Sequence, residues 1–353
     1  MEFTSLKVPN VQELAKQQVT TVPMRYIRDD IERTSCNSSM SLPQIPLIDM
    51  EKVLAIGDNS ELERLHFACK EWGFFQLVNH GVSSSLVEKV KSEIRAFFHL
   101  PMEEKNKFAQ IDGEIEGYGQ AFVVSEEQKL DWADTFYMIT LPAMSRRPHL
   151  FPKLPVSLRD TMEAYCKEIE SLARIILCQL AKTLRMDEKE IRDLFSDATQ
   201  IIRMNYYPPC PEPDRTIGLS PHSDADVLTI LLQLNETEGL QVRKDGVWIP
   251  VKPLPNAFIV NIGDMMEILS NGVYRSIEHR AVNSNEERLS LATIYIFNSD
   301  SEMGPAQSLI GPNNPPLYRR INVKKYLQDF TARKLDGKLF IDSLKVEAKD
   351  DKS

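Results

Sequence analysis

A histidine and an aspartate lie two positions apart in the stretch SPHSDADVL, which leads into the apolar run VLTILLQL. If this stretch is extended, His222 and Asp224 point to the same face, roughly 6.6 Å apart along the chain. Burying an imidazole beside a carboxylate is costly unless the two satisfy each other by hydrogen bonds or together hold a cation. An isolated His-x-Asp is most often the hydrogen-bonded pair, so a metal site requires a third ligand.

The third ligand is expected at His279, in the stretch YRSIEHRAV, because it is the only other histidine in the second half of the sequence. Two imidazoles and one carboxylate form the facial triad of non-haem Fe(II) oxygenases, which leaves coordination positions open for substrate and O₂. Zinc hydrolases use the same ligands, so the residue types alone do not choose the metal. The alternative for His279 is a core histidine that its neighbours satisfy.

An anion-binding pair is predicted on another strand, where Arg288 and Ser290 alternate in ERLSLATIYIF. A guanidinium beside a hydroxyl, both directed inward, binds a carboxylate well, because arginine donates two parallel hydrogen bonds to it. Tyr207 ends the alternating stretch RMNYY and adds a phenol donor to the same site. The alternative is an ordinary salt bridge from Arg288 to Glu286 or Glu287.

The first half of the chain must supply helices, because its apolar residues recur three and four positions apart. Asn59 or Ser60 can cap the first helix, Gly73 ends it, and Pro101 ends the second. We expect helices over residues 59–72, 83–100 and 154–186, with short strands at 44–50 and 74–82 between them. Residues 129–138 are expected to form a strand or loop that covers the mouth of the β core.

From about residue 198 the apolar period changes from 3.6 to 2, and turn residues separate the segments. So many short strands in about 100 residues predict a closed or two-sheet β architecture such as a jelly roll, with helices bracing its outside. The fold class is therefore α+β with a mainly β core. Strands are expected at 201–207, 226–234, 239–251, 257–263, 273–282 and 288–297, and a last amphipathic segment at 323–338.

Composition excludes several classes of partner. The 353 residues carry a net charge of -9, which argues against a nucleic-acid partner, and no basic amphipathic stretch favours a membrane surface. No apolar run is long enough to span a bilayer, and the N-terminus lacks the pattern of a signal peptide. Five cysteines without close spacing indicate reduced thiols. We expect a cytoplasmic monomer, with segments 32–41 and 347–353 as a polar linker and tail.

Several long phrases resemble plant Fe(II)/2-oxoglutarate-dependent dioxygenases, and they follow one another in that family's order. In the second half they are NYYPPCPEPD, GLSPHSDADVLTILLQ, GLQVRKDGVWIPVKPLPNAFIVNIGD and SNGVYRSIEHRAV with ERLS. In the first half they are IPLIDM, ACKEWGFFQLVNHGV, LPMEEKNKF and GYGQAFVVSEEQKLDWAD. The likeness covers residues 44–342. It is strongest to the group with the senescence-related dioxygenase, a dioxygenase-type norcoclaurine synthase, and the thebaine and codeine O-demethylases.

The resemblance implies a fold and a division of the chain. The fold is a double-stranded β-helix, which agrees with the change of period. The divisions are an N-terminal extension, a helix-rich N-terminal dioxygenase region, the β-helix core, and a C-terminal helix with a tail. Their expected bounds are 1–43, 44–197, 198–300 and 301–353.

The resemblance also implies the cofactors and the residues that hold them. Fe(II) would be bound by His222, Asp224 and His279. The distal carboxylate of 2-oxoglutarate would be held by four side chains that share one face of two strands, namely Arg288, Ser290, Tyr207 and Asn205. Ascorbate is the expected reductant, and O₂ the second cosubstrate.

The expected reaction is hydroxylation or O-demethylation of a small, mostly apolar aromatic plant metabolite, such as an alkaloid, flavonoid or phenylpropanoid, with release of succinate and CO₂. The same cofactors also support desaturation or ring formation. Two other readings are a zinc hydrolase built on the same three ligands and a non-catalytic binding module. Candidate pocket residues, for each of which core packing is an equal alternative, are Arg203, Phe122, Thr135, Tyr137, Ile294 and Phe297.

Two departures from the family pattern bear on these expectations. Arg288 follows His279 by nine residues, where members of the family usually have ten. A deletion inside a strand would turn Arg288 to the wrong face, so we place it in the turn NSNEE, where it only shortens a loop. The second departure is DADVL after His222, where relatives often carry an aromatic residue and glycines. It affects the substrate rather than the metal.

Overall fold

The computed structural model describes residues 6–17, 21–29, 31–32, 42–111, 113–120, 123–333, 335 and 337–346. Most of the predicted linker and all of the predicted tail lie outside these residues. Among the helices described, none is both long and apolar enough to cross a membrane.

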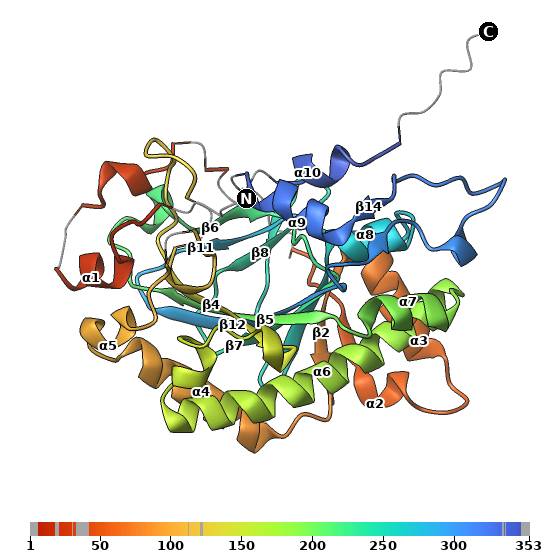
Figure 1. Cartoon of the computed structure of the whole chain (residues 1–353), viewed down its shortest axis with the longest axis horizontal. Helices are drawn as coiled ribbons and strands as arrows, with labels where there is room; N and C mark the ends of the chain where they lie inside the picture. The colour runs from red at the N-terminus through yellow and green to blue at the C-terminus, as the bar shows by residue number, and fades with distance from the viewer. Residues whose placement is uncertain are drawn as a thin grey trace, which may run out of the picture.

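Two β-sheets face each other at the centre of the molecule (Figure 1). The larger sheet joins strands from both halves of the sequence. Its order is β1 (Leu47–Asp49), β2 (Phe74–Val78), β10 (Phe258–Ile262), β7 (Leu228–Gln233), β12 (Arg288–Ile296), β5 (Thr199–Tyr207), β4 (Asp134–Leu141) and β3 (Gly117–Gly119). The smaller sheet is β6 (Ile217–His222), β11 (His279–Val282), β8 (Leu240–Lys244) and β9 (Val247–Pro250). The predicted double-stranded β-helix core is confirmed.

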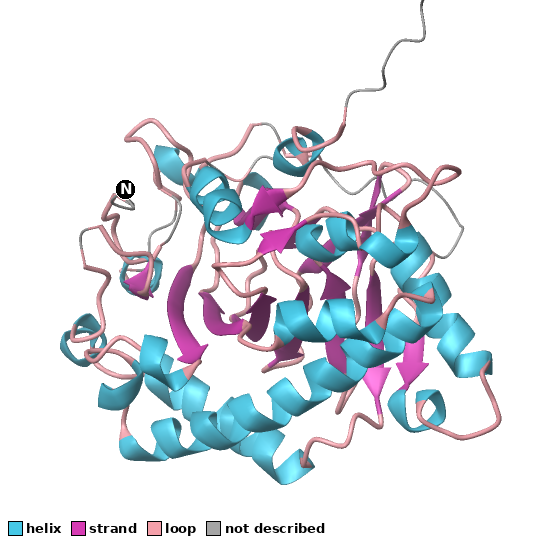
Figure 2. Ribbon diagram, turned by 45° about the vertical axis from the view of Figure 1, so that its right-hand side comes forward, coloured by secondary structure: helices cyan, strands magenta, loops and turns pink. Residues whose placement is uncertain are grey.

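Helices cover the outer face of the larger sheet, below it in Figure 1 and alongside the strands in Figure 2. α4 (Ser84–Phe98) buries Val90, Ile94 and Phe97, which recur three and four positions apart and face the sheet. The long α6 (Val156–Leu184) packs beside it. The remaining helices of the first half are α1 (Val11–Lys16), α2 (Met50–Val53), α3 (Ser60–Phe67), α5 (Met102–Asn106) and α7 (Glu188–Phe195).

Alternation along β5 decides which side chains reach the interior of the β core. The ring of Tyr206 stacks on Phe98 of α4 at a centroid distance of 5.2 Å, so Tyr206 faces the helices. Asn205 and Tyr207 therefore face the smaller sheet, as the sequence predicts. The helices bury the outer face of the larger sheet, so functional side chains can only lie on its inner face, toward the smaller sheet.

The first predicted helix ends at Gly73, as the sequence predicts. α3 continues as a π-helical turn, Ala68–Trp72, and ends at Gly73, whose φ of 60° lies in the left-handed region. A Cβ at Gly73 would lie 2.1 Å from the carbonyl oxygen of Arg275. Only glycine fits there, and β2 follows at once.

The structure corrects three expectations. The strand predicted over 273–282 is formed only from His279 to Val282. The buried helix α8 (Asp264–Leu269), which the sequence did not indicate, follows β10. Of residues 129–138, the loop before Asp134 lines the cavity at the mouth of the β core as expected, but Asp134–Leu141 is strand β4 inside the larger sheet. The last amphipathic segment forms α9 (Val323–Thr331), followed by α10 (Leu339–Asp342) and preceded by the strand pair β13 (Glu302–Met303) and β14 (Ile321–Asn322).

The N-terminal segment is part of the folded molecule. Its residues Val11 and Tyr26 pack with Leu130 and Trp132 in a small core of their own. The rings of Tyr26 and Trp132 meet edge to face at 5.2 Å. Asp134 on β4 accepts hydrogen bonds from two backbone N–H groups in the first turn of α1. The segment thus supports the loop that precedes β4.

Candidate active site

Three possible metal ligands meet between the two sheets. His222 is the last residue of β6 and His279 the first of β11, and the two residues pair across these antiparallel strands. The Nε2 atoms of His222 and His279 lie 3.4 and 3.6 Å from Oδ1 of Asp224. All three ligand atoms lie within 4.8 Å of one another, and both histidines are buried. This spacing suits one metal ion bound to all three.

Backbone carbonyls fix the orientation of both imidazoles. Nδ1 of His222 lies 2.8 Å from the carbonyl oxygen of Ser220, and Nδ1 of His279 lies 3.2 Å from that of Ile277. Each Nδ1–H donates to its carbonyl, which leaves the lone pair on Nε2 for a metal. Burial lowers the pKa of His279 to about 4, although Asp224 opposes this shift. The neutral imidazole, the form that binds metals, is therefore favoured.

Asp224 reaches the site from a turn rather than from a strand. β6 ends at His222, so the expected alternation within one strand is wrong, and the chain bends to bring the carboxylate beside the imidazole. Oδ2 of Asp224 accepts hydrogen bonds from Asn261 at 2.8 Å and from Thr229 at 2.9 Å. Burial alone would raise the pKa of Asp224, but His279, His222 and the hydrogen bond from Asn261 lower it well below its usual range. Oδ1 remains available to a cation.

The N-terminus of α8 holds this turn in place. The backbone N–H groups of Gly263, Asp264 and Met265 donate to the carbonyls of the turn, those of Val227, Asp224 and Asp226, at 3.2, 2.8 and 2.9 Å. A Cβ on Gly263 would lie 2.2 Å from the carbonyl oxygen of Asp226. This close approach requires a glycine at position 263. The only sequence signal for the start of α8 is the glycine and aspartate that follow the apolar run AFIVNI.

Arg288 lies deep in the same chamber without a carboxylate partner. Its guanidinium donates to Gln233 at 3.1 Å and lies over the ring of Tyr207, 5.0 Å from the centroid. Its Nε is buried and has no hydrogen-bond partner. The alternative salt bridge is wrong for the described residues, because the carboxylate of Glu287 accepts from Tyr206 on the outer face instead. Burying an unpaired guanidinium is costly, so the site fits a bound anion.

The other predicted cosubstrate residues face the same chamber. Pairing of β12 with β5 places Arg288 opposite Tyr207 and Ser290 opposite Asn205. The amide of Asn205 donates to the hydroxyl of Ser290 at 3.3 Å, while its buried Oδ1 has no partner. The nine-residue spacing is absorbed in the turn between β11 and β12, so Arg288 keeps the inward face. Hydrogen-bond donors of Arg288 and Ser290 and the free acceptor of Asn205 thus face the space for one small ligand.

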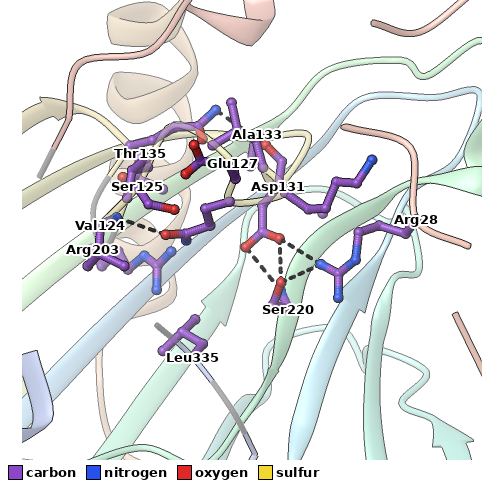
Figure 3. A pocket seen from close by; sticks show the side chains of 16 residues that line it. Arg28, Val124, Ser125, Glu127, Asp131, Ala133, Thr135, Arg203, Ser220 and Leu335 are labelled. Atoms are coloured by element: carbon purple, nitrogen blue, oxygen red, sulfur yellow. Dashed lines mark hydrogen bonds and ion pairs between the residues drawn. The ribbon is translucent and has the colours of Figure 1, made fainter. Parts of the chain in front are cut away.

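Two cavities that share one lining residue accompany these side chains. The inner chamber, of about 60 Å³, is lined by the triad, by Arg288 and by apolar side chains that include Ile294. An outer cavity of about 430 Å³ lies at the mouth (Figure 3), and Thr135 lines it. Arg203 lines both cavities. Residues 128–131 of the loop before β4 also line the outer cavity, in agreement with the expectation that residues 129–138 cover the mouth of the β core. Arg28 of the N-terminal segment lines it too, a contribution that the sequence did not reveal.

The other pocket candidates are placed differently. Phe297 is fully buried in the main hydrophobic core and is not among the described residues that line either cavity. Tyr137 on β4 packs partly against that core and also lines neither cavity. Phe122 lies outside the described residues. Core packing, the alternative for each candidate, is what the structure shows for Phe297.

The fold and the site together define a class of enzyme. The family model of the 2OG-Fe(II) oxygenase superfamily matches residues 198–296, and a model described as the N-terminal part of a non-haem dioxygenase in morphine synthesis matches residues 45–154. The donor set of the triad suits Fe(II) and the unpaired Arg288 suits the carboxylate of 2-oxoglutarate. The chain belongs to this superfamily and is a dioxygenase that uses Fe(II) and 2-oxoglutarate.

Individual relatives are similar along nearly the whole chain. Protein SRG1 of Arabidopsis thaliana is 53% identical over 98% of both chains. Thebaine 6-O-demethylase of Papaver somniferum is 50% identical over 97% of both. The oxoglutarate-dependent flavonoid 7-O-demethylase 1 of Ocimum basilicum is 51% identical over 97% of this chain and 92% of its own. A crystal structure of JOX2 in complex with 2OG, Fe and JA is 37% identical, with a TM-score of 0.88 over 96% of this chain and 98% of its own.

Proposed function

We propose that the protein hydroxylates or O-demethylates a small aromatic plant metabolite in the chamber formed by the two sheets. His222, Asp224 and His279 bind Fe(II), while Arg288 and Ser290, assisted by Tyr207 and Asn205, bind the distal carboxylate of 2-oxoglutarate. One observation carries this proposal: the triad lines one small chamber together with the buried guanidinium of Arg288, which has no carboxylate partner, and Arg203 lines both this chamber and a larger cavity. The names of the relatives, which include demethylases of alkaloids and a flavonoid, support the substrate class.

Fe(II) and 2-oxoglutarate, when bound, supply the oxidant, as O₂ is consumed and 2-oxoglutarate is converted to succinate and CO₂. The residues of the chain supply position and charge. The two imidazoles and Asp224 bind the metal from one side and leave the other side open. Arg288, which is buried, neutralises the distal carboxylate. Hydroxylation of a methoxy carbon gives a hemiacetal, which releases formaldehyde and leaves the demethylated hydroxyl group.

The rival functions lack support at the site. A zinc hydrolase needs a second group that activates water, yet Asp224 is the only carboxylate among the described residues that line the inner chamber. A non-catalytic binding module would not need an iron-binding triad. We also propose a monomer in the cytoplasm with no nucleic-acid partner. The acidic net charge supports this, as do the free thiols of the described cysteines, namely Cys69, Cys166, Cys178 and Cys210.

The direct test is succinate release from 2-oxoglutarate in the presence of Fe(II), ascorbate and O₂. We expect His222→Ala and Asp224→Ala to lower it roughly 100-fold or more, because even partners outside the ligand shell are worth 10- to 100-fold. His99→Ala is the control, since its side chain is about half exposed (54%) at the end of α4. Unchanged succinate release in both ligand variants would overturn the proposal. Formaldehyde release from methoxylated aromatics then separates O-demethylation from other outcomes.

A further inference from the structure

A β-bulge precedes the metal ligand His222 on β6. This strand forms an edge of the smaller sheet, and its pairing with β11 shifts in register beside the site. Between the pair of His279 with His222 and the next pair on β11, β6 has one residue more than its partner. Ser220 and Pro221 form the bulge. A bulge redirects the side chains beside it, and here that side chain is the imidazole of His222.

The polar backbone groups of this bulge find partners outside the strand pair. The N–H of Ser220 donates to Oδ2 of Asp131 at 3.0 Å. The carbonyl oxygen of Ser220 lies 2.8 Å from Nδ1 of His222 and accepts its proton. Pro221 has no N–H, and its carbonyl accepts from the N–H of Gly337 at 3.3 Å. Asp131 and the imidazole of His222 are thus bound to the N–H and the carbonyl of the same residue.

Asp131 is held against β6 by further contacts. Its Oδ1 accepts from the hydroxyl of Ser220 at 2.6 Å. Arg28 donates to that hydroxyl at 2.9 Å and lies 3.9 Å from Oδ1 of Asp131 (Figure 3). The next residue, Trp132, donates its N–H to the carbonyl of Ile217 at 2.8 Å, so this part of the loop before β4 lies alongside β6. The carboxylate therefore has a defined position relative to the strand.

A carboxylate suits this position because it is an acceptor only. One oxygen of Asp131 accepts from the backbone of Ser220 and the other from its hydroxyl, so the two bonds fix the residue in two directions. Burial raises the pKa of Asp131, while the hydrogen bonds from Ser220 and the charges of Arg28 and Arg203 oppose this rise. These partners favour the charged form, which accepts both bonds. Asp131 also lines the outer cavity, but both of its oxygens are already bound to the protein.

We propose that Asp131 is a positioning residue for the metal ligand His222. It holds the backbone of Ser220, whose carbonyl keeps the proton of the imidazole on Nδ1 and the lone pair of Nε2 toward the metal. Arg28 supports Asp131 and so links the N-terminal segment to the metal site. The inference rests on the proposed function, and it adds a residue that acts through another one rather than by touching the metal or the cosubstrate.

The test is the affinity of the full-length protein for Fe(II) in the absence of O₂, measured by titration calorimetry. Asp131→Asn keeps the shape of the side chain but leaves one acceptor where the carboxylate offers two, so we expect Fe(II) to bind roughly 10- to 100-fold more weakly. Arg28→Gln should weaken binding less, about 5-fold, because the bonds between Asp131 and Ser220 remain, and Arg28→Lys should recover most of that loss. Asp193→Asn, exposed on α7, is the matched control and should bind as wild type.

Two further readouts separate the positioning of His222 from a general loss of structure. The visible absorption spectrum of the Co(II)-loaded protein reports the geometry of the metal ligands, and it should change in Asp131→Asn but not in Asp193→Asn. The KM for 2-oxoglutarate at saturating Fe(II) should stay at its wild-type value in Asp131→Asn, because the proposed cosubstrate residues lie on β5 and β12 of the other sheet. Circular dichroism checks that each variant is folded.

An Fe(II) affinity of Asp131→Asn equal to that of wild type would overturn the inference, and so would an unchanged Co(II) spectrum. A KM for 2-oxoglutarate that rises as much as the Fe(II) affinity falls would also contradict it, because the damage would then reach the whole chamber. If Asp131→Asn does not fold, the loss in Arg28→Gln and its recovery in Arg28→Lys decide the question. Failure of the proposed function looks different, since wild-type protein itself would bind no Fe(II) and release no succinate, and the inference would fall with it.

Discussion

Each metal ligand has one polar atom fixed by the protein and one left free for the metal. Ser220 and Ile277 accept from the Nδ1 atoms of the two histidines, while Asn261 and Thr229 occupy Oδ2 of Asp224. The free atoms, the two Nε2 and Oδ1, face one another. In Arg288 the free atom is a donor instead, because its Nε is buried without a hydrogen-bond partner. At the scale of the residue, the site is prepared for a cation at one point and an anion at another.

Replacement of Arg288 by glutamine tests the anion site. We expect the KM for 2-oxoglutarate to rise about 10- to 100-fold, because a charged hydrogen bond to a carboxylate is lost in a buried chamber. The kcat at saturating 2-oxoglutarate should fall much less, since the triad is untouched. Steady-state succinate release measures both constants, with Arg192→Gln as a matched surface control. A KM that matches wild type would show that the cosubstrate is held elsewhere.

At the scale of the element, α8 and the N-terminal segment position the site from outside the strands that carry it. The first turn of α8 binds three carbonyls of the turn that contains Asp224. The N-terminal segment packs against Trp132 and Leu130, and its Arg28 donates to Ser220, whose carbonyl orients His222. Both elements act on residues next to a metal ligand rather than on the ligating side chain itself.

Gly263→Ala tests the role of α8. The added methyl would clash with the backbone of Asp226, which cannot move without shifting the turn that carries Asp224. We expect Fe(II) affinity to fall roughly 10-fold or more, with a loss of about 1–3 kcal/mol in the free energy of unfolding. Gly311→Ala is the control, because a Cβ there has no neighbour within 4 Å. Metal titration followed by protein fluorescence reports the affinity, and equal affinities in the two variants would refute this role.

Asp134 gives the docking of the N-terminal segment a pH dependence. Burial raises the pKa of Asp134 to about 6, although hydrogen bonds from Val11 and Gln12 and the charge of Lys105 oppose this. A raised pKa means that the folded state favours the protonated carboxyl. Its contribution to stability is therefore complete below about pH 4 and is lost as the pH rises through about 6.

The corresponding measurement compares wild type with Asp134→Asn, which stays neutral at every pH. Relative to this variant, wild type should lose on the order of 3 kcal/mol of unfolding free energy between pH 4 and pH 7. Urea unfolding at a series of pH values measures the difference. A difference that does not change with pH would contradict the buried, proton-binding state of Asp134.

At the scale of the whole molecule, the period of the apolar residues predicted most of the architecture. Period 3.6 before residue 198 corresponds to the covering helices, and period 2 after it to the smaller sheet and to strands β5, β7, β10 and β12 of the larger one. The larger sheet also takes β1 to β4 from the first half of the sequence. Alternation predicted that Arg288 and Ser290 share one face of their strand, as do Asn205 and Tyr207, and the structure places all four on the inner face. The site residues that could be predicted from the sequence are those whose own side chains would bind the metal or the cosubstrate.

The rest of the site escaped prediction for physical reasons. α8 is buried on all sides, so its sequence shows no amphipathic period. It holds the turn at Asp224 by backbone N–H groups, and these cannot be recognised from the sequence because almost every residue type has one. The turn itself replaced the expected strand geometry. Arg28 reaches the outer cavity through contacts across more than half of the chain, and no local pattern predicts such packing.

The central claim is that three distant side chains bind one Fe(II) ion between the two sheets, with 2-oxoglutarate anchored on Arg288. A crystal structure of the protein grown with Fe(II) and 2-oxoglutarate without O₂, with anomalous scattering recorded at the iron edge, tests it most directly. The result we predict is a single anomalous peak bonded to Nε2 of His222, Nε2 of His279 and Oδ1 of Asp224, with the distal carboxylate on Arg288. A peak elsewhere, or an imidazole turned away from it, would contradict the account.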